Sequence, residues 1–208
     1  MEVRKKPFYS FVKRLFDFIV SLLFVIVFSP FFLVIMLIIS LSDMKGKPIF
    51  VQDRVGKNGK IFKLYKFRTM CIDAEDQKAS LREQNEADGP AFKIKDDPRI
   101  TKIGGFLRKT NIDELPQMIN ILIGNMSFVG PRPTIPEEVA QYSETDKLRQ
   151  LVTPGLTCYW QASKNRNDIP FDEWMALDRK YIEDRGFLLD LKLIFRTIAA
   201  VFKDRDGR

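Results

Sequence analysis

An uncharged apolar run near the N-terminus is the feature that most restricts how this chain can fold. Residues 18–42 read FIVSLLFVIVFSPFFLVIMLIISLS and contain no charged residue. As one helix, this run is long enough to cross a hydrocarbon core of about 30 Å. It is too long for the apolar part of a signal peptide, and no small-residue cleavage site follows it. The run therefore predicts a helix embedded in a membrane.

Two features oppose a simple transmembrane span. Ser29-Pro30 lies near the middle of the run, and a proline removes one helical hydrogen bond and clashes with the preceding turn. Each half then has about a dozen residues, which suits a re-entrant helix that leaves the membrane on the side it entered. Ser29 is expected to satisfy backbone groups that the proline frees.

Basic residues flank the run on both sides, and the positive-inside tendency would keep both of its ends in the cytoplasm. These residues are Arg4, Lys5, Lys6, Lys13 and Arg14 before the run, and Lys45, Lys47, Arg54, Lys57 and Lys60 after it. On the residues alone, a single span and a re-entrant helix both stay open.

The net charge of +7 is distributed unevenly along the chain. Residues 1–70 contain 13 Lys and Arg against 4 Asp and Glu, whereas the remaining residues contain 21 against 23. A basic excess around an apolar run indicates an anionic membrane surface rather than nucleic acid. We therefore expect anionic membrane lipid as a partner and no nucleic acid.

The composition limits the chemistry available to this chain. It contains no histidine, which excludes Ser-His-Asp triads, Cys-His pairs and histidine-ligated metal sites. Cys71 and Cys158 are too few for a four-thiolate zinc site or a disulfide framework. Any catalysis must therefore use carboxylates, Lys, Arg, Tyr or backbone groups, and any metal is expected to be an oxygen-ligated ion such as Mg²⁺.

Beyond the apolar run, the pattern predicts a mostly helical α+β domain. A β-hairpin is expected over 48–70, because alternating apolar residues flank Asn58-Gly59, a strong signal for a two-residue turn. Helices are expected over 72–87 and 103–109, from about 111 to 123, from the end of SFVGPRPTIPEE to about 151, and over 171–183 and 187–202, with a short strand in TPGLTCYWQ. We expect residues 1–44 to form the membrane anchor and residues 45–208 a cytosolic catalytic domain at the membrane interface.

The last predicted helix, FLLDLKLIFRTIAAVF, is amphipathic. It is apolar enough to lie on a bilayer, and packing on the protein core is an equally good account of it. Asp190 inside this helix needs a polar partner or a cation on either account.

Two adjacent carboxylates, Asp113 and Glu114, stand out in RKTNIDELPQ, residues 108–117. A purely structural account makes Asn111 a helix N-cap and Glu114 its partner in a capping box. A functional account makes Asp113 a nucleophile toward a phosphoryl group and Glu114 a ligand of Mg²⁺. Such an attack needs cations to offset the like charges. The candidate cations are Lys66, Arg68, Arg108 and Arg132, the last of them in GPRP.

Several segments, in the same order, resemble the bacterial sugar transferases, also called monotopic phosphoglycosyl transferases. The segments are DFIVSLLFVIVFSPFFLVI, PIFVQDRVGKNGKIFKLYKFRTM, LRKTNIDELPQMINILIGNMSFVGPRP, TPGLTCYWQ and LLDLKLIFRT. They cover nearly the whole chain, and the central one is highly specific. The resemblance implies transfer of a phosphosugar from a UDP-sugar to a polyprenyl phosphate, usually undecaprenyl phosphate, with release of UMP.

The resemblance also implies roles for individual residues. Asp113 would attack the sugar-linked phosphate, carry the phosphosugar covalently and then be displaced by the lipid phosphate. Glu114 would bind Mg²⁺, together with Asp113, or assist proton transfer. The positive residues of the family site are matched by Lys66, Arg108 and Arg132, and acids that shape its pocket by Asp178 and Asp190. Arg166 is expected in the loop WQASKNRND, which departs from the Ser-Gly-Arg-Asn that family members often have there.

The family's apolar segment is a re-entrant helix broken at Ser-Pro, which matches Ser29-Pro30. The resemblance therefore implies a monotopic protein of the bacterial inner membrane, with its catalytic domain and amphipathic helices at the cytoplasmic face. The sugar is left open between galactose, glucose and N-acetylated sugars, and the oligomeric state between a monomer and a homodimer. A non-enzymatic membrane scaffold and a lipid-diphosphate phosphatase are the alternative functions.

Overall fold

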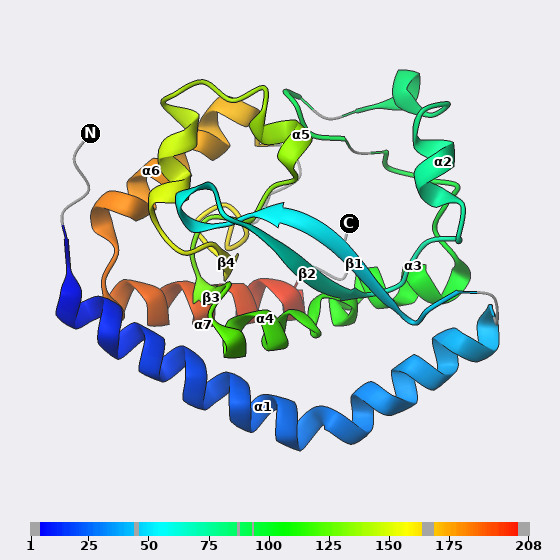
Figure 1. Ribbon diagram of the computed structural model, residues 1–208, viewed down its shortest axis with the longest axis horizontal. Coiled ribbons are helices and arrows are strands. Elements are labelled where there is room, and N and C mark those ends of the chain that lie inside the picture. Colours follow the sequence, from blue (N-terminus) through cyan, green and yellow to red (C-terminus); the bar gives the residue numbers. More distant parts are fainter. Residues whose placement is uncertain (1–4, 44–45, 87, 93, 164–168, 204–208) are drawn as a thin grey trace.

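The computed structural model describes residues 5–43, 46–86, 88–92, 94–163 and 169–203 (Figure 1). Its first element, α1 (Pro7–Ser42), is one helix that continues through Pro30 and bends near its middle. The predicted break at Ser29-Pro30 is therefore wrong. Pro30 has no N–H to donate to the Ile26 carbonyl, and the Ser29 hydroxyl donates a hydrogen bond to that carbonyl at 2.9 Å instead. The expectation that Ser29 satisfies a group freed by the proline is confirmed.

One side of α1 packs on the rest of the protein, and the other side is open. Phe11, Leu23, Val27 and Leu37 are each more than half exposed. Within the described residues, α1 is the one helix long and apolar enough to cross a membrane. An apolar surface of this extent indicates contact with lipid.

Strands β1 (Ile49–Val55) and β2 (Ile61–Phe67) form the predicted antiparallel hairpin. Its connection is longer than a two-residue turn. The N–H of Gly56 donates to the carbonyl of Lys60 at 2.8 Å, and a 3₁₀ turn over Lys57–Gly59 lies between them. The Asn-Gly pair that predicted the turn is at its tip, and both residues have positive φ angles. The position of the turn is thus confirmed, while its predicted length is wrong.

Short elements make up the middle of the chain. They are α2 (Ala74–Lys78), a 3₁₀ turn (Arg82–Gln84), α3 (Lys102–Lys109), a 3₁₀ turn (Ile112–Glu114), α4 (Gln117–Ile123), β3 (Ser127–Val129), α5 (Pro136–Val139), a 3₁₀ helix (Asp146–Leu151) and β4 (Gly155–Thr157). The long helix predicted over 72–87 is wrong, because this polar stretch offers no apolar face to pack and a short unsupported helix is marginal. The helix predicted to end near 151 is also wrong, since α5 and a 3₁₀ helix replace it.

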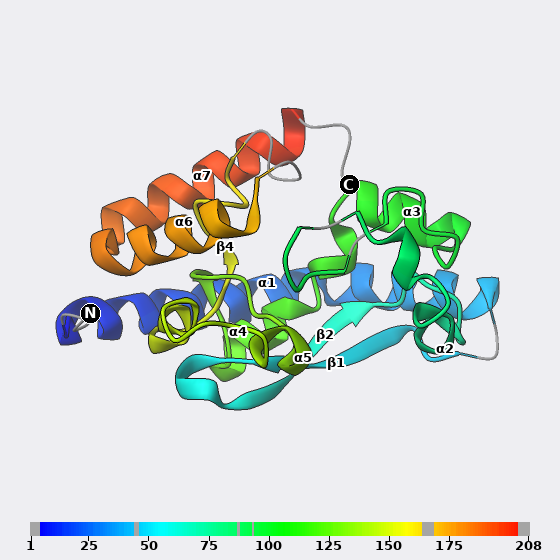
Figure 2. The same ribbon diagram turned by 90° about the horizontal axis from the view of Figure 1, so that it is seen from above.

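The chain closes with α6 (Phe171–Asp184) and α7 (Phe187–Lys203), which confirm the two predicted C-terminal helices. Strands β3 and β4 pair in parallel. Figure 2 shows the α6–α7 pair and the hairpin on opposite sides of the molecule, with α4, β3 and β4 between them. The protein is mostly helical with a small antiparallel hairpin, as its sequence predicts.

Three groups of buried side chains join these elements. In the first, Phe32, Ile35 and Ile39 of α1 pack with Phe67 of β2 and Leu107 of α3. The second joins the hairpin to α4, and the third joins β3 to α6 and α7. Helix α7 therefore packs on the core through one face. The hairpin, α3 and α4 are held around the turn that carries the two adjacent carboxylates.

Candidate active site

The adjacent carboxylates lie in a tight turn between α3 and α4. The 3₁₀ turn Ile112–Glu114 follows Asn111, whose φ of 55° is left-handed, and Pro116 then stands at the start of α4. The Asn111 side chain makes no capping hydrogen bond, so the capping-box prediction is wrong. Asn111 instead reverses the chain direction, and asparagine adopts this conformation at lower cost than most residues.

Glu114 accepts two charge-assisted hydrogen bonds on one oxygen. Lys66 Nζ, from β2, lies 2.9 Å from Glu114 Oε1, and Arg132 Nη2, from the segment after β3, lies 2.8 Å from the same atom. Burial acts to raise the pKa of Glu114, but Arg132 and Lys66 outweigh it and hold that pKa well below its ordinary range. Glu114 is therefore ionised at neutral pH and fixes two cations beside the turn.

Asp113 has a different environment one residue earlier. It is 8% exposed, and burial raises the pKa of its carboxyl, while Lys66 and Arg108 act in the opposite direction. Among the described residues, Asp113 forms no ion pair, whereas Glu114 forms two. A shielded carboxylate with nearby cations that it does not engage is suited to attack an electrophile.

Two further predicted cations have separate positions. Arg108 Nε donates to Thr69 Oγ1 at 2.9 Å; burial lowers the pKa of Arg108, and the nearby Asp113 carboxylate counteracts that shift. Arg68 donates to the Asp43 carbonyl at 3.0 Å and lies 3.4 Å from the Asp43 carboxylate. Arg108 thus lies in the field of the acid pair, while Arg68 joins the hairpin to the end of α1.

Asp178 lies behind the site rather than in it. It pairs with Arg149 at 2.8 Å, and the two side chains are 1% and 4% exposed. Burial raises the pKa of Asp178 to about 6, with Arg149 acting in the opposite direction. Arg149 also donates to the backbone carbonyl of Arg132 at 2.8 Å. Asp178 is therefore connected to Glu114 indirectly: it pairs with Arg149, which holds the backbone of Arg132, whose side chain pairs with Glu114.

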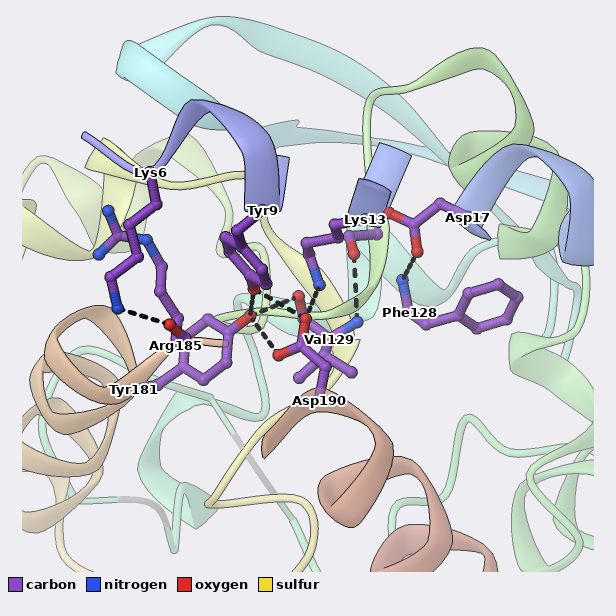
Figure 3. Close-up of polar contacts among 10 residues, drawn as sticks. Lys6, Tyr9, Lys13, Asp17, Phe128, Val129, Tyr181, Arg185 and Asp190 are labelled. Carbon is purple, nitrogen blue, oxygen red and sulfur yellow. Dashed lines mark hydrogen bonds and ion pairs between the residues drawn. The ribbon is translucent and has the colours of Figure 1, made fainter. Parts of the chain in front are cut away.

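Asp190 lies where α1 meets α7, as Figure 3 shows. Its carboxylate accepts hydrogen bonds from Tyr9 at 2.7 Å and Tyr181 at 3.0 Å and pairs with Lys13 at 2.6 Å. The expectation that Asp190 needs a polar partner or a cation is confirmed. Arg166 lies outside the described residues.

Two arginines that the sequence reasoning did not assign to the site stand next to Arg132. Arg149 holds the Arg132 carbonyl, and Arg54 Nη1 donates to the Pro133 carbonyl at 3.0 Å. Side chains alternate between the two faces of the hairpin, and the strand register places Arg54 on the same face as Lys66. This alternation could have identified Arg54 as a candidate site residue. Arg149 carries no comparable signal, since it lies in an irregular 3₁₀ helix.

Asp113 and Glu114 are the carboxylates at this turn that a metal ion can use. Both hydrogen bonds that Glu114 accepts from described residues go to Oε1, which leaves Oε2 for a further ligand. The described residues contain no group of three or more potential ligands. This donor set fits Mg²⁺, which uses one or two carboxylates and takes its other ligands from water and substrate phosphates.

Comparison with known proteins relates this arrangement to a family. The family model described as bacterial sugar transferase matches residues 8–204. The chain is 49% identical over 156 residues to galactosyl transferase CpsE of Streptococcus agalactiae serotype III, a match covering 75% of this chain and 35% of the relative. It is 38% identical over 204 residues to undecaprenyl-phosphate galactose phosphotransferase of Salmonella typhimurium, covering 95% and 41%. It is also 38% identical over 204 residues to exopolysaccharide production protein ExoY of Sinorhizobium fredii, covering 96% and 89%. The chain thus spans less than half of the first two relatives and most of the third.

Proposed function

Because the chain belongs to the bacterial sugar transferase family, we propose that it transfers a phosphosugar from a UDP-sugar to undecaprenyl phosphate. The products are undecaprenyl diphosphosugar and UMP. The Salmonella relative named as an undecaprenyl-phosphate galactose phosphotransferase supports this acceptor. The relative named as an exopolysaccharide production protein supports a role in exopolysaccharide synthesis. We propose that the transfer is the first membrane step of that synthesis.

The observation that carries this proposal is the contrast between the two adjacent carboxylates. Glu114 is held ionised by Lys66 and Arg132, whereas Asp113 forms no ion pair among the described residues. One acid therefore organises the cations, and the other is available to react. A nucleophile next to fixed cations is what transfer of an anionic phosphoryl group requires.

In the first half-reaction, an Asp113 carboxylate oxygen attacks the sugar-linked phosphorus of the UDP-sugar. The bond between this phosphorus and the bridging oxygen breaks, and UMP leaves with the electron pair. Asp113 then carries the phosphosugar as an acyl phosphate. Lys66, Arg108 and Arg132 offset the charge of the diphosphate as the carboxylate approaches, and the forked guanidinium of Arg132 suits phosphate oxygens.

In the second half-reaction, an oxygen of undecaprenyl phosphate attacks the same phosphorus and displaces Asp113. The carboxylate is regenerated, and the lipid diphosphosugar is released. Both nucleophiles are anions, so neither step needs a base to remove a proton. This favours Glu114 as an anchor for cations over Glu114 as a proton carrier, in keeping with its lowered pKa.

We also propose that Glu114, with Asp113, holds Mg²⁺ together with oxygens of the donor diphosphate. The ion would supply neutralisation of the diphosphate charge. Glu114 Oε1 is occupied by Lys66 and Arg132, so Oε2 would be the oxygen of this residue that holds the ion.

The contacts of α1 support a re-entrant helix in one leaflet. In its N-terminal arm, Lys13 pairs with Asp190 of α7 at 2.6 Å. In its C-terminal arm, the ring of Phe32 meets that of Phe67 of β2, with centroids 5.6 Å apart. Both arms are therefore bound to one body, and a span would have to detach one of them. The basic flanks favour the cytoplasmic face of the bacterial inner membrane, where Asp113 meets the phosphate of a lipid whose chain stays in the bilayer.

Substitution of Asp113 tests the nucleophile directly. We expect Asp113→Asn to abolish UMP release from UDP-sugars, because an amide cannot form the acyl phosphate, while membrane association stays intact. UMP production would be measured with UDP-galactose, UDP-glucose and N-acetylated UDP-sugars, and the wild-type adduct would be mapped by mass spectrometry. The exposed Asp172→Asn is the matched control. Normal turnover by Asp113→Asn, or an adduct on another side chain, would refute the assignment.

The rival functions give different products. A transferase forms a lipid-linked sugar when undecaprenyl phosphate is added to the UDP-sugar. A lipid-diphosphate phosphatase forms none and instead releases inorganic phosphate from undecaprenyl diphosphate. A non-enzymatic scaffold does neither.

A further inference from the structure

The backbone that carries Arg132 is held from two sides by cationic side chains, of which Arg149 is buried and Arg54 half-buried. Arg149 Nη2 donates to the carbonyl of Arg132 at 2.8 Å, and Arg54 Nη1 donates to the carbonyl of Pro133 at 3.0 Å. These carbonyls belong to consecutive residues, and the N–H of Val55 also donates to the next carbonyl, that of Thr134, at 2.9 Å. Three successive peptide groups are thereby fixed, two of them by charge-assisted hydrogen bonds.

Both arginines are themselves rigidly placed. Arg149 pairs with Asp178 at 2.8 Å, donates to Tyr142 Oη at 2.9 Å and lies over the ring of Trp174 at 4.9 Å. Arg54 uses its second amino group on Gln52 at 2.6 Å. Burial lowers the pKa of Arg54 to about 10, and the nearby Arg132 contributes to that shift.

Burying these two guanidiniums costs free energy through desolvation, and for Arg54 also through repulsion by Arg132. A neutral side chain would fill the same space without that cost. The hydrogen bonds to the two carbonyls are what the arginines supply in return, and they determine where the Arg132 side chain leaves the backbone. That side chain then meets Glu114 Oε1 at 2.8 Å while staying 28% exposed.

We propose that Arg54 and Arg149 are positioning residues, which hold the Arg132 guanidinium between Glu114 and the donor diphosphate by fixing the carbonyls of Arg132 and Pro133. This inference rests on the proposed function, because it concerns the same acid pair. Neither arginine touches substrate in this role. Asp178 belongs to the same support, since its carboxylate fixes Arg149.

Lysine variants separate charge from geometry. Arg54→Lys and Arg149→Lys keep the positive charge, but one ammonium cannot reproduce the forked contacts of a guanidinium. We expect each to lower kcat for UMP release by about 10- to 100-fold, the size of effect that a small displacement of a reacting group produces. The KM for the UDP-sugar should change much less. Arg179→Lys is the matched control, because Arg179 is half-buried and only 3.6 Å from its partner Asp146.

A double-mutant cycle with Arg132→Ala decides whether the two arginines act through Arg132. If they do, Arg54→Lys and Arg149→Lys lose most of their effect once the Arg132 side chain is absent. An equal loss of kcat in both backgrounds overturns the proposal, as does unchanged kcat in the single variants. If Arg132→Ala is too slow to assay, hydrogen–deuterium exchange decides the question instead. If Arg149→Lys does not fold, the cycle with Arg54→Lys stands alone, since Arg54 lies on a hairpin strand and is only partly buried as a residue.

A second readout does not depend on activity. Hydrogen–deuterium exchange of the amides of Gly130, Arg132 and Thr134 should be faster in Arg54→Lys and Arg149→Lys than in the wild type, and unchanged in Arg179→Lys. Unaltered exchange in all variants would overturn the proposal. A wild-type protein that releases no UMP from any UDP-sugar refutes the proposed function instead, so the two failures are distinguishable.

Discussion

At the scale of single residues, the site places two carboxylates side by side. Each negative charge raises the pKa of the neighbouring carboxyl group, and burial raises both pKa values further. The structure gives the close contacts of Lys66 and Arg132 to Glu114, which lowers its pKa, and leaves Asp113 with a raised pKa. The pKa values of the two acids are therefore shifted in opposite directions. Such opposite shifts usually mean that two adjacent titratable groups have different roles.

Asp178 gives a pH-dependent prediction. Its folded-state pKa is raised by burial to about 6, from an ordinary value of 3.8. The folded protein therefore binds this proton more tightly than the unfolded chain, so the stability contributed by this group is present below about pH 4 and is lost as the pH rises through 6. We expect the wild type to lose about 2 kcal/mol of unfolding free energy relative to Asp178→Asn between pH 4 and pH 7. Urea unfolding of both proteins in detergent measures the difference.

The exposed Asp172→Asn is the control for that experiment, and it should follow the wild type at every pH. Parallel stability curves for the wild type and Asp178→Asn would show that the Asp178 carboxyl titrates normally.

Residue-level reasoning from the sequence reached the acid pair and its two direct partners, Lys66 and Arg132. It did not assign Arg54 and Arg149 to the site, because a single arginine in a sequence is by default a solvated surface group. Their burial depends on carbonyls and on an acid, Asp178, that only the folded chain brings to them. Arg68 follows Lys66 by two residues. The sequence does not reveal that its side chain pairs with Asp43 at the end of α1.

At the scale of elements, prediction succeeded where apolar residues recur at helical or strand spacing, or where a strong turn signal is present. The hairpin, α3, α4, α6 and α7 all have an apolar face that packs on the core, and their types are confirmed. Their approximate bounds are confirmed too, except that α4 begins at Gln117 rather than near residue 111, after a 3₁₀ turn over Ile112–Glu114. The stretch over 72–87 lacks such a face, and only one helical turn forms there. The turn at Asn111 was misread because Asn is favoured as a helix N-cap and is also one of the few residues that adopt the left-handed conformation.

We attribute the bend of α1 to Pro30, and replacement of this proline gives a second prediction. With Pro30→Ala, the Ile26 carbonyl regains a backbone donor, so we expect the helix to straighten. Spin labels at the exposed positions Phe11 and Leu37 should then move apart, toward the roughly 39 Å expected for a straight helix of this span. Pulsed electron–electron distance measurements in nanodiscs report the change, after Cys71 is replaced by serine. Pro7→Ala is the matched control, because a proline at the first helical position breaks no hydrogen bond.

At the scale of the whole molecule, α1 packs along much of its length on the catalytic body, by which we mean the elements from β1 to α7. Its N-terminal arm carries a stripe of polar side chains, Lys6, Tyr9, Lys13 and Asp17, that contacts the body near α6, α7 and β3 (Figure 3). Its C-terminal arm shares a core group with the hairpin and α3. The polar stripe is spaced for one helix face, yet its partners lie more than a hundred residues away, so the sequence shows the stripe without showing what it binds.

This double attachment makes the membrane topology testable at the two ends of α1. If the helix is re-entrant, single cysteines introduced as Lys5→Cys and Lys47→Cys, in a background without Cys71, lie on the same side of the membrane. We expect a membrane-impermeant thiol reagent to label neither position in intact cells and both after permeabilisation. Leu151→Cys, in the exposed part of the catalytic body, should behave identically. Labelling of only one of the two positions from outside would mean that the helix crosses the bilayer. The contacts of one arm with the catalytic body would then have to break in the membrane, leaving either the Lys13–Asp190 pair or the Phe32–Phe67 packing unmade.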